Sequence, residues 1–159
     1  MCTKQCLCYN FSKMIITIYL DTCSIQRPLD TKSQIRIALE AEAVLGILSL
    51  VEMNQIKLIA SEMLLLEINR NPNQIRREYA LEVISKAKSF VKVNSRIEKR
   101  SKEFTALGIR FFDAVHLASA EESRADYFCT CDDVLLKRAQ NLPGLKVKVV
   151  SPTELVKEL

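Results

Sequence analysis

The sequence predicts an α/β fold in which helices cover both faces of a mainly parallel sheet. Short β-branched, apolar runs alternate with helical patterns along the chain, which is the order expected of βαβ units. The chain has 159 residues, the usual size of one domain, and contains only 3 glycines and 4 prolines. All-β sandwiches and barrels need more turn residues, so this composition favours long regular elements.

The first part of the chain contains two predicted strands, each followed by a helix. Residues 15–20 are almost continuously apolar, as in a central strand buried on both faces. Apolar residues at near-helical spacing predict a long helix over 33–53. Its polar face carries three charged residues that we expect in solvent, Arg36, Glu40 and Glu42. A second strand is expected at 56–60, and Ser61 is a suitable N-cap for the next helix.

The same alternation continues to the end of the chain. Asn71 and Pro72 predict the N-cap and first residue of a helix that extends to about residue 88. Residues 95–98 have the spacing of a capping box, and the helix that they open should end at Gly108. The other expected elements are strands at 90–93, 127–130 and 145–150 and helices at 113–124, 133–140 and from 151 onward.

The composition excludes several classes of protein. Hydrophobic residues at 48% and charged residues at 26% are typical of a globular chain and argue against disorder. The net charge of +4 is far below that of a dedicated DNA-binding module. The longest apolar runs are much shorter than the roughly 20 residues of a membrane span, and the N-terminus does not resemble a secretory signal. We therefore expect a cytoplasmic protein without a membrane segment.

Residues 1–13 show neither a periodic pattern nor a helix cap. We interpret them as a disordered or spurious leader, so the domain comprises residues 14–159. The six cysteines are expected to be free thiols in a reducing compartment. A metal site is the alternative interpretation for Cys2, Cys6 and Cys8, although their spacing matches no common zinc pattern.

Acidic residues follow several of the predicted strands. Asp21 directly follows the first strand, Asp132 comes shortly after a later one, and Glu67 lies about two turns into the helix after the second. Asp113 begins a helix, and His116 lies one turn further on, where we expect a hydrogen-bonded residue rather than a ligand. Ligands bind at the carboxyl ends of parallel strands, and carboxylates that converge there repel one another unless they share a cation. Oxygen-only ligation suits Mg²⁺ or Mn²⁺.

These acids also have purely structural interpretations. Asp21 is suited to a turn or an N-cap, and either Asp132 or Asp133 should cap the helix that follows. Glu67 and Asp113 are less easily explained in this way, because their neighbours in the sequence are apolar. A buried carboxylate needs a partner or a metal ion.

Four short segments together resemble the acidic motifs of PIN-domain nucleases. They are residues 19–24 (YLDTCS), 61–67 (SEMLLLE), 112–120 (FDAVHLASA) and 130–135 (TCDDVL). The resemblance extends from residue 14 to about residue 159, and it is the order of the motifs in a βαβ context that makes it specific. It implies a three-layer α/β/α sandwich and an endoribonuclease that depends on Mg²⁺ or Mn²⁺. It also implies, in many members, a toxin that a cognate antitoxin neutralises; a homodimer is compatible with the sequence.

The resemblance assigns roles to individual residues. The acidic positions of the family, which we expect to be catalytic and metal-binding, correspond to Asp21, Glu67, Asp113 and Asp132. Supporting positions correspond to Thr22, Ser24, Thr130 and Asp133. We expect Asp21 and Asp113 to bind the first metal ion, and Glu67 and Asp132 to bind a second ion or bridging waters. The fourth acid could be either Asp132 or Asp133, and the offset from Thr130 favours Asp132. Cys23 departs from the family, where Asn or Ser is more common.

In this chemistry a divalent cation promotes deprotonation of water, which attacks the phosphodiester in line, while the cation offsets charge on the phosphate oxygens. RNA is therefore the expected partner. Basic residues near the motifs are candidates for contacts with its backbone phosphates: Arg27, Arg70 and Arg110, and further Lys32, Arg76 and Arg77.

Two other classes of function are open on the sequence. Other Mg²⁺-dependent hydrolases on doubly wound sheets generally use a nucleophilic Asp with a second Asp two positions on, but position 23 is Cys. A catalytically silent module that binds RNA or protein has no need of all four acids. A metal-dependent cleavage assay separates these alternatives.

Overall fold

The structure, a computed structural model, describes residues 15–159. The predicted leader and the possible metal site at Cys2, Cys6 and Cys8 lie outside the described residues. The described strands form one sheet with the order β3-β2-β1-β4-β5, and every neighbouring pair is parallel. Their bounds are β1 (Thr17–Leu20), β2 (Lys57–Ser61), β3 (Ser89–Val91), β4 (Tyr127–Cys129) and β5 (Lys148–Val150).

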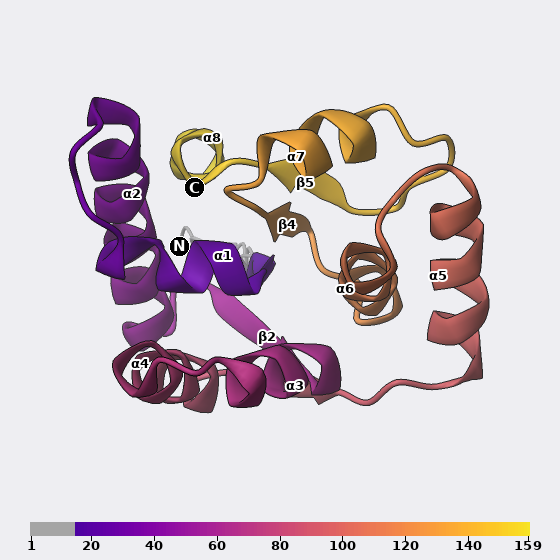
Figure 1. The fold of residues 1–159 in the computed structure, drawn as a ribbon, viewed down its shortest axis with the longest axis horizontal. Helices are drawn as coiled ribbons and strands as arrows, with labels where there is room; N and C mark the ends of the chain where they lie inside the picture. Colours follow the sequence, from indigo (N-terminus) through magenta and orange to yellow (C-terminus); the bar gives the residue numbers. More distant parts are fainter. Residues whose placement is uncertain (1–14) are drawn as a thin grey trace, which may run out of the picture.

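Helices cover both faces of this sheet (Figure 1). On one side α2 (Ile35–Glu52) packs against α8 (Pro152–Glu158), and on the other α5 (Ser95–Ala106) packs against α6 (Phe111–Glu122). The remaining elements are α1 (Thr22–Gln26), the 3₁₀ helix η1 (Arg27–Leu29), α3 (Glu62–Arg70), α4 (Gln74–Ser85) and α7 (Asp133–Gln140). The predicted three-layer α/β/α sandwich with a parallel sheet is therefore confirmed. Within residues 15–159, no helix combines the length and hydrophobicity needed to cross a membrane.

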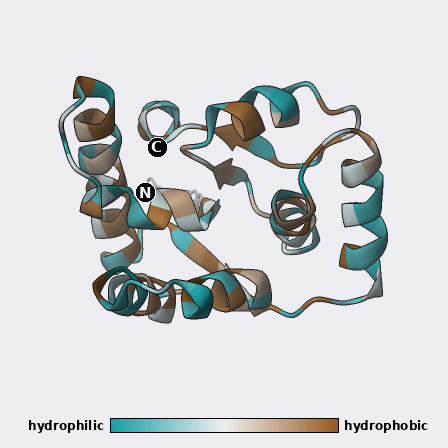
Figure 2. Ribbon diagram, in the orientation of Figure 1, coloured by the Kyte–Doolittle hydropathy of each residue, from teal (hydrophilic) through white to brown (hydrophobic). Residues whose placement is uncertain are grey.

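The predicted first strand lies at the centre of the sheet. In β1, Ile18, Tyr19 and Leu20 are fully buried between β2 and β4. The ring of Tyr19 stacks on Phe128 of β4, with centroids 5.5 Å apart. Figure 2 shows hydrophobic residues along β2 and α6, whereas hydrophilic and hydrophobic residues alternate along α5 at the edge of the molecule. The continuous apolar run of β1 therefore reflects burial on both faces of the sheet.

Two predicted helix starts were wrong. Asn71 ends α3, where its backbone N–H donates to Ile68, and the side chain of Asn73 caps α4 instead. The N-cap of α5 is Asn94 rather than Ser95, because Asn94 Oδ1 accepts hydrogen bonds from the second and third amides of that helix. In both cases a neighbouring Asn satisfies the free amides of the first turn. By contrast, the expected capping box that opens α8 at Ser151 is present.

The expectation that Glu40 faces solvent was also wrong, since Glu40 is only 3% exposed. Glu40 Oε2 lies 3.0 Å from Arg27 Nε, and its Oε1 accepts a hydrogen bond of 2.8 Å from Arg36. Arg36 also contacts Asp133 of α7, while Arg27 contacts Asp30. A buried carboxylate is tolerated here because two guanidinium groups compensate its charge.

Candidate active site

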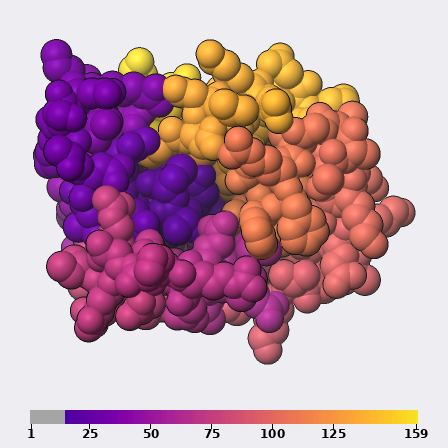
Figure 3. Space-filling view, in the orientation of Figure 1, coloured from indigo at the N-terminus to yellow at the C-terminus, as the bar shows by residue number. Residues whose placement is uncertain are grey.

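Asp21 and Asp132 follow the carboxyl ends of β1 and β4, the neighbouring strands at which the strand order switches from one side of β1 to the other, and Glu67 and Asp113 reach the same place from α3 and α6. This is the usual position of a ligand site in an open parallel sheet. The amide of Asp21 donates to the carbonyl of Cys129, so the residues that follow the two strands are held side by side. A cavity of about 580 Å³ opens here; it is lined by Asp21, Thr22, Cys23, Gln26, Glu67, Arg70, Asn71, Pro72, Phe112, Asp113, His116 and Asp132. Figure 3 shows the surface recessed where indigo atoms of α1 meet magenta atoms of α3 and orange atoms of α6.

Asp21 is fixed by the first turn of α1. Its Oδ1 accepts a hydrogen bond of 2.8 Å from the amide of Ser24, as an N-cap does, and the residue is only 6% exposed. The thiol of Cys23 donates to the same carboxylate, with Sγ 3.0 and 3.1 Å from its two oxygens. The structural and functional interpretations of Asp21 are thus compatible, because the cap holds the carboxylate in the cavity wall.

Two further aspartates reach the cavity from other elements. Asp132 caps α7, with Oδ1 accepting from the amides of Val134 and Leu135. Asp113 lies in the first turn of α6. Burial raises the pKa of Asp113, and the negative charges of Asp132 and Asp21 raise it further against the opposing effects of His116 and Arg110. The three aspartates are therefore close enough to repel one another.

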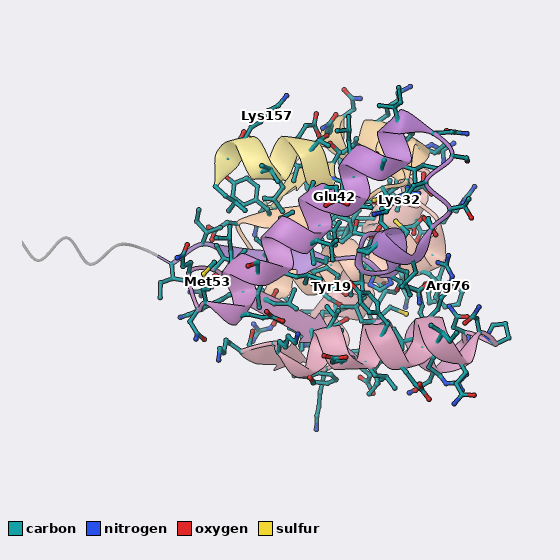
Figure 4. All side chains as sticks on the ribbon, turned by 90° about the vertical axis from the view of Figure 1, so that its left-hand side faces the viewer. Tyr19, Lys32, Glu42, Met53, Arg76 and Lys157 are labelled. Carbon is teal, nitrogen blue, oxygen red and sulfur yellow. The ribbon has the colours of Figure 1, made fainter. Side chains whose placement is uncertain are left out.

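The fourth acid, Glu67, is held by a buried chain of hydrogen bonds. Its Oε2 lies 2.9 Å from His116 Nε2 and accepts a hydrogen bond of 2.5 Å from Thr22. On the far side of the imidazole, Nδ1 lies 2.7 Å from the hydroxyl of Tyr19, which in turn lies 2.6 Å from Ser61 Oγ. Tyr19, labelled in Figure 4, is seen in the interior behind α2.

The hydrogen bonds of this series can all be donated in one direction, from Ser61 toward Glu67. Ser61 Oγ accepts from the amide of Leu64, which leaves its own proton for Tyr19. Tyr19 then donates to Nδ1, and the remaining ring N–H of His116 donates to Glu67. Burial tends to raise the pKa of Glu67, but the hydrogen bonds from His116 and Thr22 outweigh burial and lower the pKa. The lowered pKa favours the ionised form of Glu67, and the two hydrogen bonds to Oε2 fix the orientation of its carboxylate.

Sequence reasoning missed the hydrogen bonds that link Ser61 and Tyr19 to His116, and the place of Phe112 in the cavity wall. His116 was expected to be a hydrogen-bonded helix residue, which it is, but nothing in the pattern indicated that its partner is Glu67. A polar ring three residues after Asp113 on an otherwise apolar helix was the one available signal. Tyr19 gave none, because a tyrosine in a buried strand is indistinguishable from other core residues.

The supporting residues divide between the cavity and its surroundings. Thr22 lines the cavity, whereas Ser24 and Thr130 are fully buried and bind backbone groups: Ser24 Oγ donates to Cys129, and Thr130 Oγ1 accepts from the amide of Asp132. Asp133 lies outside the cavity wall and pairs with Arg36 of α2.

The predicted phosphate-binding residues also fall into two groups, those that line a cavity and those that are held by other partners. Arg70 lines the main cavity, and Arg110 lines a small adjoining one together with Asp113 and Asp132. Arg27 lines neither, because Glu40 and Asp30 hold its guanidinium. The other candidates also have partners: Lys32 pairs with Glu42, Arg76 with Asp30, and Arg77 donates to the carbonyl of Asn71. The carbonyl of Arg110 accepts from the amide of Ala114, but among the described residues no hydrogen bond or ion pair engages the side chain of Arg70 or Arg110.

The donor chemistry of the cavity fits a hard divalent cation. Within residues 15–159, no three His, Cys, Asp or Glu side chains are placed closely enough to bind a metal ion as a group. Mg²⁺, however, usually keeps several waters and takes only one or two carboxylates from the protein. Asp21, Asp113 and Asp132 supply carboxylate oxygens, and the pKa of Asp113 is raised mainly by burial and further by the negative charges of Asp132 and Asp21. A cation among them would relieve this repulsion.

Comparisons with known proteins agree with this fold. A family model described as PIN domain matches residues 18–141. Two solved structures are similar: VapBC2 from Rickettsia felis bound to a DNA fragment from their promoter, and PAE2754 from Pyrobaculum aerophilum. The first has a TM-score of 0.57 and 15% identity over 86% of this chain and 98% of the other. The second has a TM-score of 0.51 and 15% identity over 91% and 97%. No curated relative matches by sequence. Because the family model covers most of the chain, the protein belongs to the PIN domain family of nucleases.

Proposed function

We propose that the protein is an endoribonuclease that uses Mg²⁺ or Mn²⁺ to cleave phosphodiester bonds of RNA. The observation that supports this function most directly is the convergence of Asp21, Asp113 and Asp132 with Glu67 in one cavity at the switch point of the sheet. A silent interaction module has no need of three mutually repelling carboxylates, which cost stability unless a cation binds.

The cavity residues have distinct tasks in this proposal. A bound divalent cation would supply Lewis-acid stabilisation of the phosphate and a more acidic water. Asp21 and Asp113 would hold the cation, and Asp132 would hold a second ion or its waters. Glu67 Oε2 is occupied by Thr22 and His116, while its Oε1 accepts no hydrogen bond within the described residues. That free oxygen is available to orient the attacking water.

The biological setting that we propose is a toxin restrained by an antitoxin. Its support is the likeness to VapBC2, which was solved bound to a DNA fragment from their promoter. The target would be cellular RNA, and the protein would therefore act in the cytoplasm. Free thiols at Cys23, Cys129 and Cys131 are compatible with a reducing compartment.

Cleavage of a fluorogenic single-stranded RNA tests the proposed function. We expect activity in millimolar Mg²⁺ or Mn²⁺, none in EDTA, and recovery when metal is restored. Asp21→Asn and Asp132→Asn should each lower kcat at least about 100-fold, as expected when a group that stabilises the transition state is lost. Asn is as good an N-cap as Asp, so both variants should remain folded.

The adjacent residue provides the matched control. Asp133 has the same chemistry as Asp132 but lies outside the cavity, so Asp133→Asn should keep activity close to that of the wild type. Full cleavage in EDTA, or equal losses in the Asp132 and Asp133 variants, would contradict the proposed function.

A further inference from the structure

We propose that Phe112 is a stacking platform for an unpaired base of the RNA next to the scissile phosphate. The inference rests on the proposed nuclease function and narrows its substrate to single-stranded nucleotides. It assigns a base-binding role to a residue outside the acidic set.

The first observation is the exposure of two adjacent aromatic rings. Phe111 is 59% exposed and Phe112 is 42% exposed, although the following turns of the same helix are almost completely buried. Their rings lie edge to face, with centroids 5.5 Å apart and an interplanar angle of 68°. Phe111 therefore braces Phe112 from the side. Such exposure is costly for rings of this size unless a ligand covers them.

The second observation is the position of Phe112 relative to the acids. Its side chain lines the same cavity as Asp21 and Glu67, and it is the immediate neighbour of Asp113. A nucleotide whose phosphate lies among the carboxylates would have its base within reach of this wall. Phe111 does not line the cavity, which identifies Phe112 as the ring that meets the base.

The third observation concerns charge. Arg70 lines the main cavity together with Phe112, and Arg110, two positions before Phe112, lines the small adjoining cavity with Asp113. Both are exposed and lack ion pairs among the described residues, whereas Arg27, Arg36 and Arg76 all pair with carboxylates. An exposed aromatic ring that shares a cavity with one guanidinium group without an ion pair, and lies two positions from another, matches the alternating bases and phosphates of a single strand.

Fluorescence provides a direct test, because the chain contains no tryptophan. Phe112→Trp, combined with Asp21→Asn to prevent cleavage, places one indole in the cavity wall. The probes are a single-stranded 2′-O-methyl RNA oligonucleotide and the same oligonucleotide with abasic residues. We expect the complete strand to quench the emission and the abasic strand to leave it almost unchanged. Phe90→Trp in the same background is the matched control, since Phe90 is 48% exposed on the edge strand β3 and outside the cavity wall.

Cleavage kinetics provide the second measurement. Phe112→Ala should raise KM for single-stranded RNA at least about fivefold, the smallest loss usually seen when one base loses its aromatic partner. Phe90→Ala should not change KM.

The outcomes separate this inference from the proposed function. Equal quenching by complete and abasic strands, or an unchanged KM in Phe112→Ala while wild type cleaves RNA, would overturn the platform and leave the nuclease intact. Quenching that requires bases, with no cleavage by wild type in Mg²⁺ or Mn²⁺, would support the platform and contradict the nuclease. Self-association that Phe112→Ala abolishes, without any response to RNA, would identify the rings as a protein interface and overturn the inference.

Discussion

The imidazole of His116 joins Glu67 to the hydrophobic core: Nε2 lies 2.9 Å from Glu67 Oε2, and Nδ1 lies 2.7 Å from the hydroxyl of Tyr19. Tyr19 is fully buried in the central strand and stacks on Phe128, so it cannot move without disturbing the sheet. The orientation of a carboxylate in the cavity is thereby set by the packing of the core.

Removing the Tyr19 hydroxyl should weaken both stability and activity. In Tyr19→Phe, Ser61 Oγ and His116 Nδ1 lose a buried partner, which should lower the free energy of unfolding by about 1–3 kcal/mol. A less restrained imidazole should also lower kcat about tenfold, equivalent to about 1.4 kcal/mol in the barrier. Urea unfolding and initial rates at saturating RNA measure the two effects. The control is Tyr127→Phe, whose hydroxyl bonds to Glu158 at the surface; equal losses in both variants would contradict the role of the buried chain.

Neutralising Asp113 should not destabilise the protein when metal is absent. Its raised pKa means that folding disfavours the ionised form, so its charge costs stability at pH values above the folded pKa. In EDTA near neutral pH, Asp113→Asn should melt at the same Tm as wild type or higher. The difference should shrink as the pH falls through the folded pKa toward about pH 4, where an ordinary carboxyl becomes protonated.

Metal should reverse this order. Wild type should gain about 2.7 kcal/mol at a Mg²⁺ concentration of one hundred times its dissociation constant, and Asp113→Asn should gain less. Thermal melts of both proteins in EDTA and in Mg²⁺ make the comparison. If the variant were less stable in EDTA but responded to Mg²⁺ as wild type does, Asp113 would be a structural residue.

The buried ion pairs of Glu40 should contribute strongly to stability. Glu40→Ala removes the carboxylate between Arg27 and Arg36 and leaves the Arg27 guanidinium, only 16% exposed, without that partner. Breaking a buried pair in this way costs about 3 kcal/mol. The matched variant is Glu42→Ala, whose exposed pair with Lys32, seen at the surface in Figure 4, should contribute less than about 1 kcal/mol. Similar midpoints of urea unfolding for the two variants would show that Glu40 does not stabilise the fold.

The thiol of Cys23 should be replaceable by another hydrogen-bond donor. Cys23→Ser keeps a donor beside both oxygens of Asp21 and should keep kcat within about threefold of wild type. Cys23→Val removes the donor and should lower kcat about tenfold, because a hydrogen bond to a charged group contributes about 1.5 kcal/mol or more. Parallel cleavage assays, with circular dichroism as the check on folding, decide the matter. A fully active valine variant would show that Asp21 needs no donor at this position.

The order of strands and helices was predictable because each element carries its own local pattern. The apolar run before Asp21 predicts a strand buried on both faces of the sheet. Because β1 and β4 are parallel neighbours, the residues that follow them lie at the same edge of the sheet. The four predicted acids line one cavity: Asp21 and Asp132 follow strands, Asp113 lies in the first turn of α6 and Glu67 in the second turn of α3. Helix starts at Asn73 and Asn94 were missed by one or two positions, since several capping residues stood next to one another in the sequence.

The partners of these residues were decided by tertiary structure alone. Tyr19 and His116 are 97 positions apart, and no periodicity of 2 or 3.6 residues carries information about a contact over that separation. The same limit explains Glu40, whose position in the helical pattern predicted exposure to solvent but whose carboxylate is buried against Arg27. It also explains Asp133, which pairs with Arg36 outside the cavity while the adjacent Asp132 lines it. The sequence by itself determined which chemical groups reach the edge of the sheet. Packing between distant elements determined which of them remain free to bind a ligand, because each charge is held by whichever opposite charge the fold brings within contact distance.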